Sequence, residues 1–243
     1  MTEEPLLSII FPAHNEEHRL PQAIQQTLEF LNQQSYAAEI IIVENGSSDK
    51  TWQIAQDAAA ASPSVRAIRE EGKGKGLAIR RGMMEAHGEC RFACDVDLSM
   101  PINEVNRFIP PQLTADIVIA SREAPGSKRY NEPEYRHFIG RVFNLLVRIV
   151  ALHGIHDSQC GFKCFSRKAA EELFALQTIM GWTFDVEILF IARKHGYRIV
   201  ELGIPWYHDP NSKIRVFKDS FNMLIDLLVI RWNYLRGRYA TKA

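Results

Sequence analysis

Two carboxylates stand one residue apart at Asp95 and Asp97, directly after an apolar segment that ends at Cys94. Where a strand turns into a loop, both side chains can reach one hard divalent cation. Mg²⁺ and Mn²⁺ prefer such oxygen ligands, and phosphate oxygens and water complete their coordination. The competing interpretation is a solvated acidic turn. The position after a predicted strand favours a site for Mg²⁺ or Mn²⁺ and a diphosphate.

Two further polar segments follow predicted strands, at residues 12–17 (Pro-Ala-His-Asn-Glu-Glu) and 44–51 (Glu-Asn-Gly-Ser-Ser-Asp-Lys-Thr). Short polar side chains and backbone N–H groups at a crevice edge suit a base and a ribose. Each segment could equally start a helix, with Asn15 as the first cap and Ser48 or Asp49 as the second. Taken singly, the capping interpretation is the stronger one for both segments.

Three other segments carry groups whose chemistry the spacing leaves open. The basic loop 71–76 (Glu-Gly-Lys-Gly-Lys-Gly) matches neither common phosphate-loop pattern, so we expect a flexible cover for a nucleotide and not a P-loop kinase. Residues 157–163 (Asp-Ser-Gln-Cys-Gly-Phe-Lys) fit a plain turn or the wall of an acceptor site. Thr183 is expected to cap a helix with Asp185 in its first turn, and either Asp185 or Glu187 could face the crevice.

Several other kinds of site are disfavoured. The eight histidines show no H-E-x-x-H spacing and no nucleophile elbow, which argues against zinc and serine hydrolases. The cysteines form two C-x3-C pairs, but residues four apart on a strand are roughly 13 Å apart, so buried thiols are expected instead of zinc. Because 29 basic residues balance 29 acidic ones, a general nucleic-acid binder is also disfavoured.

Alternating strands and helices position these groups and predict an α/β fold with a mainly parallel sheet flanked by helices. The carboxyl ends of parallel strands form the binding crevice of such a sheet. Function is therefore expected just after Phe11, Val43, Cys94 and Ser121. The expected strands are 6–11, 39–43, 65–68, 91–94 and 116–121, and the expected helices are 17–32, 49–61 and 76–86, with a short helical piece near 103.

The second half differs in composition. Residues 122–134 are rich in Gly, Pro, Ser and charge, as in a mobile lid. Two amphipathic helices are expected, at 138–152 and 217–236. Their apolar faces could pack as core or could meet a membrane surface through arginines. The polar stripes are Arg141, Asn144 and Arg148 on the first, and Asn222, Asp226 and Asn233 on the second, which ends with Arg231, Arg236 and Arg238.

No apolar run approaches the roughly 20 residues that a membrane-spanning helix needs. The acidic start lacks the pattern of a signal peptide. We therefore expect a cytoplasmic protein, peripheral on the cytoplasmic face of a membrane if the two helices bind lipid.

The motifs together resemble family 2 glycosyltransferases of the GT-A fold, a Rossmann-like fold that binds nucleotide-diphospho-sugars. The motifs are residues 9–17, 42–51, 74–76 and 95–97 in that order. The later segments 157–163, 182–187 and 211–213 look like those of dolichyl-phosphate β-glucosyltransferases, with dolichyl-phosphate mannose synthases as near relatives. The resemblance covers about residues 6–236. It implies one GT-A domain over 1–243, with a nucleotide-sugar and metal half (1–121) and an acceptor half (122–243).

The resemblance also implies roles for matching positions. Asp95 and Asp97 would hold the metal and the donor diphosphate, while Arg122 and Lys213 would meet phosphate from loops that are mobile without ligand. Glu44-Asn45 replaces the usual Asp-Asp pair, which leaves the base preference open because an amide both donates and accepts. The membrane span of the eukaryotic glucosyltransferases is also missing. The implied substrate-binding residues are Pro12, His14, Glu16, Val43, Asn45, Lys75, Val96, Ser99, Arg122, Gln159 and Lys213.

The implied reaction is inverting transfer of a hexose, foremost glucose from UDP-glucose, to a polyprenyl phosphate. The acceptor phosphate is already largely ionised near neutral pH, so no strong general base is required. The candidate catalytic carboxylates are Asp97, Asp185 and Glu187. Alternatives are a family 2 enzyme that uses GDP-mannose or a non-lipid sugar acceptor, and a non-catalytic nucleotide-sugar-binding protein.

Overall fold

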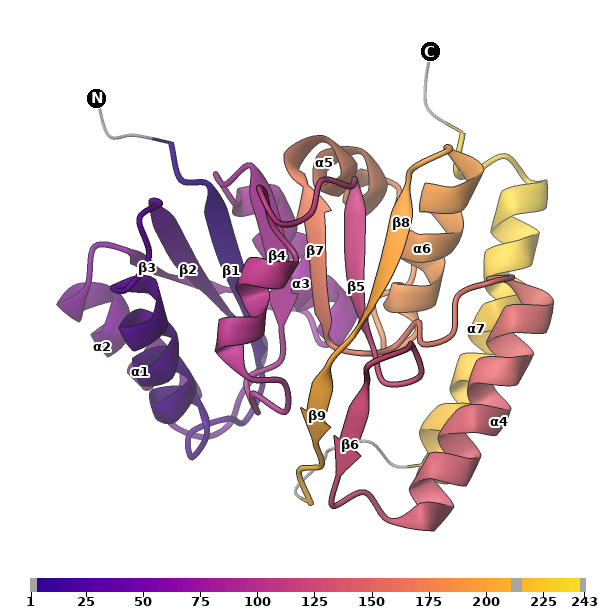
Figure 1. Cartoon of the computed structure of the whole chain (residues 1–243), viewed down its shortest axis with the longest axis horizontal. Coiled ribbons are helices and arrows are strands. Elements are labelled where there is room, and N and C mark those ends of the chain that lie inside the picture. Colours follow the sequence, from indigo (N-terminus) through magenta and orange to yellow (C-terminus); the bar gives the residue numbers. More distant parts are fainter. Residues whose placement is uncertain (1–3, 211–215, 241–243) are drawn as a thin grey trace.

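A seven-stranded sheet forms the centre of the protein (Figure 1). This computed structural model describes residues 4–210 and 216–240, without the side chains of Arg136, Phe138 and residues 216–221. The strands lie in the order β3-β2-β1-β4-β7-β5-β8, and within this sheet only β7 runs antiparallel to its neighbours. The bounds are β1 (Leu7–Ala13), β2 (Ala38–Glu44), β3 (Val65–Arg69), β4 (Cys90–Cys94), β5 (Ile117–Ser121), β7 (Phe162–Ser166) and β8 (Ile199–Gly203).

Helices cover both faces of the sheet, which explains the nearly continuous apolar runs of its inner strands. Successive side chains alternate between the two cores: Ile9 and Phe11 pack on one side of the sheet and Ile10 on the other. The first core includes residues of α1 (Leu20–Leu31), α2 (Thr51–Ala61) and the 3₁₀ helix η1 (Ile102–Arg107). The opposite core includes residues of α3 (Lys75–Glu85), α5 (Arg167–Ala175) and α6 (Phe184–Lys194).

The alternating pattern up to residue 121 is confirmed, with helices and strands starting or ending within about three residues of the predicted positions. The second half contains elements that the pattern did not predict. These are the central strand β7, helix α5, the edge strand β8, and a separate two-stranded parallel sheet of β6 (Lys128–Tyr130) and β9 (Pro205–Tyr207). The small sheet lies beside the carboxyl ends of β5 and β8 (Figure 1).

Two long helices, α4 (Glu134–Val150) and α7 (Val216–Leu235), lie side by side at one end of the molecule (Figure 1). The predicted polar stripes are divided between solvent and core, and Arg141 and Asn222 are exposed. Asn144 of α4 and Asn233 of α7 are buried, and Asp226 accepts a hydrogen bond from the Thr183 hydroxyl at 2.6 Å. Among the described residues, no helix has the length and apolarity to cross a bilayer.

The exposed surface of these two helices carries many large apolar side chains. We call a set of large, exposed hydrophobic side chains on α4 and α7 the apolar stripe. It consists of Tyr135, Val142, Leu145 and Ile149 on α4, and Leu224, Ile225, Leu228, Val229, Trp232 and Leu235 on α7.

Candidate active site

A cavity of about 790 Å³ opens at the carboxyl ends of β1, β4 and β5, where the parallel sheet predicts a binding crevice. It gathers most of the residues that the sequence indicated. Those that line it are Pro12, His14, Glu16, Asn45, Lys75, Asp95, Val96, Asp97, Ser99, Arg122, Gln159 and Asp185.

Asp95 and Asp97 lie together on the cavity lining, directly after β4. Asp97 accepts a hydrogen bond from the Ser99 amide at 2.9 Å, and Asp95 forms an ion pair with the Lys75 ammonium at 2.6 Å. Burial, followed by the neighbouring Asp95 charge, raises the pKa of Asp97. Two acids that share a desolvated edge carry negative charge that a cation would stabilise.

The residues at this edge fit a divalent cation. Both carboxylates offer hard oxygen ligands, and the Lys75 ammonium already occupies a cation position against Asp95. Burial opposes the charged form of Lys75, but Asp95 and Asp185 outweigh it and raise the lysine's pKa. The described residues contain no group of three or more His, Cys, Asp or Glu arranged as a complete metal site. Such a two-carboxylate edge is typical of Mg²⁺ sites that phosphate and water complete.

Gly161 supports Asp95 by leaving space for it. A Cβ atom at this position would lie 1.9 Å from Asp95 Oδ2, so the carboxylate would have to move if residue 161 carried a side chain. The Asp95 amide also donates to the Gly161 carbonyl at 3.2 Å. The residue just before β7 therefore bonds the Asp95 backbone, and its lack of a side chain leaves the Asp95 carboxylate in its present position.

The first two polar segments are joined into one structure by hydrogen bonds between their loops. The Ser48 amide donates to Asn15 Oδ1 at 2.8 Å, and the Glu17 amide donates to Asp49 Oδ2 at 3.2 Å. The expected helix starts differ in detail, because α1 begins only at Leu20 after Arg19, and α2 begins at Thr51 after Lys50. Asn15 and Asp49 thus bind the opposite loop and bring both segments to the cavity edge.

Asn45 has one side of its amide committed to the protein. Its Nδ2 donates to the Gly74 carbonyl at 3.0 Å, which assigns the amide orientation because a carbonyl only accepts. His14 Nδ1 donates to the Asn45 carbonyl at 2.8 Å. Gly74 itself has φ +135°, and a Cβ there would lie 2.2 Å from the Met180 carbonyl oxygen. Gly74, directly before the start of α3, therefore packs closely against the backbone of Met180.

Asp185 and Glu187 point to different places. Asp185 lines the cavity and pairs with Lys163 Nζ at 2.8 Å, and burial raises its pKa. Glu187 is fully buried away from the cavity lining, where it accepts hydrogen bonds from the Ile179 amide at 2.8 Å and the Tyr239 hydroxyl at 2.7 Å. The prediction of Glu187 as a catalytic residue is therefore corrected. Its role in this structure is to hold the 178–179 backbone and the segment after α7.

Thr183 does not cap α6 with its side chain, since its hydroxyl donates to Asp226. The helix instead begins with two acids in its first turn, where the helix dipole favours negative charge.

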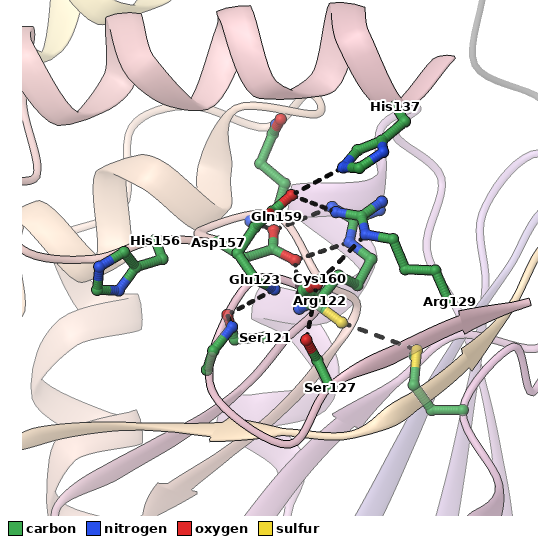
Figure 2. A network of polar contacts seen from close by, with 12 residues as sticks. Ser121, Arg122, Glu123, Ser127, Arg129, His137, His156, Asp157, Gln159 and Cys160 are labelled. Carbon is green, nitrogen blue, oxygen red and sulfur yellow. Dashed lines mark hydrogen bonds and ion pairs between the residues drawn. The ribbon is translucent and has the colours of Figure 1, made fainter. Parts of the chain in front are cut away.

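Arg122 lies on the cavity lining but is firmly held, so the prediction that it is mobile without a ligand is wrong. Figure 2 shows its guanidinium against Asp157, with Nε to Oδ2 at 2.7 Å and Nη2 to Oδ1 at 2.9 Å. The Arg122 amide donates to the same carboxylate at 3.0 Å. Although burial alone would raise it, the pKa of Asp157 is lowered to about 2 by Arg122. The loop after β5 is anchored by this ion pair.

Arg129 and Trp206 also line the cavity, and neither was predicted from the sequence. Arg129 forms ion pairs with Glu123 and Glu132, each at 2.5 Å. Figure 2 shows Arg129 and Glu123 in the same polar network as Arg122. The Arg122 and Arg129 guanidiniums lie 5.4 and 6.0 Å from the centre of the Trp206 ring. We call these three residues the arginine wall. The only available signal was the basic, glycine-containing loop that holds Arg129.

Three further predictions have different outcomes. Val43 is fully buried, and its side chain belongs to the core against Gly82, so it does not line the cavity as predicted. Lys213 lies outside the described residues. All four cysteines are buried and none forms a disulfide, and burial raises the pKa of Cys160 to about 12.

Comparison with known proteins adds independent information. A family model described as glycosyl transferase family 2 matches residues 8–174. A dolichyl-phosphate beta-glucosyltransferase of Dictyostelium discoideum is 32% identical, over 98% of this chain and 77% of the relative. The human dolichyl-phosphate beta-glucosyltransferase is also 32% identical, over 96% and 77% of the two chains.

Solved structures show the same fold at lower identity. The glucosyl-3-phosphoglycerate synthase of Mycobacterium tuberculosis in complex with UDP superposes with a TM-score of 0.68 at 19% identity, over 98% of this chain and 82% of that one. The same enzyme with Mn²⁺, UDP and phosphoglyceric acid gives a TM-score of 0.67 at 17% identity, over 98% and 80%. The GT-A architecture expected from the motifs is thereby confirmed.

Proposed function

We propose, from the premise that this chain belongs to glycosyl transferase family 2, that it transfers glucose from UDP-glucose to a polyprenyl phosphate with inversion at the sugar. The chain is a glycosyltransferase, and its relatives named above are glucosyltransferases that act on dolichyl phosphate. One observation carries the finer proposal. A single cavity joins a paired-acid edge, suited to a metal and a diphosphate, to an arginine wall beside the two helices of the apolar stripe.

Asn45 supports a uracil base in the donor. One N–H of its Nδ2 donates to the Gly74 carbonyl, which fixes the amide so that Oδ1 can accept from a ligand, as the carboxylate in the usual Asp-Asp pair would. An acceptor at this place suits the N3–H of uracil. The departure from the usual motif is then compatible with UDP, which is the nucleotide bound in the mycobacterial structure.

Asp95 and Asp97 would hold the cation, in keeping with the Mn²⁺ and Mg²⁺ of the solved relatives. When bound, a divalent cation neutralises charge that develops on the leaving nucleotide diphosphate. Lys75 lies beside the same edge and can donate to a diphosphate oxygen. All six further residues line the same cavity. Pro12, His14 and Glu16 would border the nucleotide, and Val96, Ser99 and Gln159 would border the sugar and the acceptor.

The arginine wall supports a phosphate acceptor. Arg122 and Arg129 are oriented by carboxylates behind them, and guanidiniums recognise phosphate through paired hydrogen bonds. A phosphate monoester is a nucleophile that needs no deprotonation near neutral pH. Asp185 is then available to bind and orient the sugar, and no residue has to act as a strong base.

The apolar stripe supports a lipid acceptor and a peripheral position on a membrane, for which we propose the cytoplasmic face. The same helix α4 contributes Gly140, Phe143 and Asn144 to the cavity and Leu145 and Ile149 to the outer surface. On α7, Asn233 is buried while several large apolar side chains are exposed. A helix that faces only water and its own core has the opposite pattern, with apolar side chains inside and polar ones outside. An interfacial helix buries such a face in the headgroup region, which would bring the cavity to the prenyl phosphate.

A panel of donors and acceptors tests the proposal. UDP-glucose and GDP-mannose are each offered with prenyl phosphates of several lengths, with a soluble sugar acceptor, and with or without Mg²⁺. We expect metal-dependent glucosyl transfer to prenyl phosphate and little transfer from GDP-mannose. Transfer to the soluble acceptor alone would replace the lipid acceptor. Donor binding without any transfer would leave a nucleotide-sugar-binding protein.

Liposome co-sedimentation tests the membrane step separately. Leu228→Gln, Trp232→Gln and Leu235→Gln together remove three large side chains from the apolar stripe. We expect them to weaken binding to anionic vesicles by at least about ten-fold, because each buried methylene contributes about 0.8 kcal/mol. Charge reversal at Arg231, Arg236 and Arg238 should make the remaining binding less sensitive to salt. Met84→Gln, which alters an exposed apolar residue on α3, is the matched control.

A further inference from the structure

Lys163 is a buried cation in the middle of the central sheet. Its side chain is 2% exposed, and it stands opposite Ala93 of β4 and Ile119 of β5 in the strand register. Residues opposite each other on neighbouring strands share a face of the sheet. Ala93 and Ile119 belong to the core beneath α6, so the lysine rises from an apolar layer. A lysine there is costly unless its charge is paired.

The ammonium of Lys163 has two partners at the floor of the cavity. It pairs with Asp185 Oδ1 at 2.8 Å, and it donates to the Cys160 carbonyl. Asp185 lines the cavity, whereas Lys163 does not. Lys163 therefore reaches the site only through these two groups, one on α6 and one in the loop that leads to Gly161.

The charges alternate across the floor of the site. Lys163 pairs with Asp185, and Lys75 pairs with Asp95 at 2.6 Å. Lys75 is also attracted by Asp185, which thus has a cation on each side. The order Lys163, Asp185, Lys75, Asp95 leads from the sheet interior to the metal edge.

Stability alone does not explain this arrangement. Replacing a buried ion pair by well-packed apolar residues is often neutral or stabilising, so such a pair is weak evidence for stability. A buried pair whose acid forms part of a cavity lining has a second possible use, because a carboxylate with one fixed partner keeps one orientation. Asp185 needs a fixed orientation if it binds the sugar.

We propose that Lys163 is a positioning residue, which holds the Asp185 carboxylate toward the sugar and joins it to the Cys160–Gly161 backbone on which Asp95 rests. The inference depends on the proposed glucosyl transfer for its kinetic consequence. The pairing of Lys163 with Asp185 does not depend on it.

The test compares Lys163→Met, Asp185→Asn and the double variant with the wild-type chain. Transfer from UDP-glucose to a short prenyl phosphate is measured with Mg²⁺, and unfolding is followed in urea. We expect Lys163→Met to lower kcat by about 10–100-fold with KM for UDP-glucose changed less than about three-fold, as for other residues that orient a ligand-binding group. The double variant should regain stability relative to Lys163→Met yet remain as inactive as Asp185→Asn. Lys168→Met, in an exposed pair with Glu172, is the matched control and should retain full activity.

The outcomes separate the two proposals. Full activity of folded Lys163→Met, or additive losses of activity in the double variant, would overturn the positioning role. If the wild-type chain transfers no glucose, the proposed glucosyl transfer is wrong, and the urea unfolding experiment alone tests the ion pair. Recovery of stability in the double variant then supports the pairing of Lys163 with Asp185, and additive losses of stability overturn it. If Lys163→Met does not fold, folding of the double variant supports the pair, while its failure to fold overturns it.

Discussion

Removal of the Arg122 side chain should destabilise the protein, because it leaves a fully buried carboxylate without its cation. Asp157 is 0% exposed and accepts from Arg122 through Nε, Nη2 and the amide. In Arg122→Met the Asp157 carboxylate retains only backbone donors, the amides of residue 122 and of Gln159. Breaking a buried ion pair by removing one partner costs about 3–5 kcal/mol.

The pKa of Asp157 gives a second measure of the same interaction. It is lowered from 3.8 to about 2, and each unit corresponds to 1.36 kcal/mol, so ionisation of Asp157 contributes about 2.5 kcal/mol at neutral pH. Because the native pKa is the lower one, this stability is present above about pH 4 and is lost as pH falls through 2. About half should be lost at pH 3. The loss in Arg122→Met at pH 7 should be at least this large, because Asp157 without its cation must either stay charged in a buried site or take up a proton well above its usual pKa.

Urea unfolding followed by tryptophan fluorescence at pH 7, 5 and 3 measures these effects. The stability difference between wild type and Arg122→Met should be largest at pH 7 and should narrow at pH 3. Arg122→Met combined with Asp157→Asn should recover part of the loss. Arg81→Met, which breaks an exposed pair with Glu85, is the matched control and should cost less than about 1 kcal/mol. A loss at Arg122 no larger than at Arg81, with no change in pH dependence, would refute the reasoning.

Three other substitutions test the site. Asp97→Asn should abolish Mn²⁺-dependent binding of UDP in calorimetry without loss of thermal stability, because burial already disfavours the charge of Asp97; unchanged affinity would end the metal assignment. Gly161→Ala should displace the Asp95 carboxylate and lower kcat by about 100-fold, and a variant with wild-type kcat would show that Asp95 can move without consequence. Glu187→Gln should cost about 2–4 kcal/mol in urea unfolding while the folded enzyme keeps its kcat within about three-fold. A large loss of kcat with unchanged stability would restore Glu187 as a catalytic candidate.

The first half of the fold could be predicted because its signals are local. Each strand up to residue 121 is an apolar run that ends in polar residues, and each is followed by a helical pattern. Strand β7 could not be found in this way, since Lys163 interrupts its apolar pattern and its pairing partners lie about 70 and 45 residues earlier in the chain. Strand β8 is only partly buried, which weakens its pattern further.

The site shows the same division between local and distant information. Asp95, Asp97 and Asn45 follow strands directly, so their place at the carboxyl edge was predictable. The prediction for Val43 was wrong because side chains alternate along a strand, and the Val43 side chain packs in the core. The sequence argues against a catalytic role for Glu187 together with Asp185, because residues two apart on a helix lie on opposite sides.

The ion pair that anchors Arg122 could not be predicted from the sequence. Its partner Asp157 lies 35 residues later, in a segment that read equally as a turn. Trp206 stands opposite Arg129 because β6 pairs with β9 across a long separation in the chain, and Arg122 lies 5.4 Å from the same ring.

The insertion of β7 between β4 and β5 also has a consequence during synthesis. When the ribosome has made residues 7–94, the strands β3, β2, β1 and β4 are complete, but the β7 edge partner of β4 is not. At about 5–20 residues per second, residues 162–166 follow roughly 3–14 seconds later. During that interval β4 presents unpaired backbone groups along an apolar strand, the kind of edge that pairs with other chains. The nascent chain is therefore expected to expose an aggregation-prone edge until the strand that completes the site has emerged.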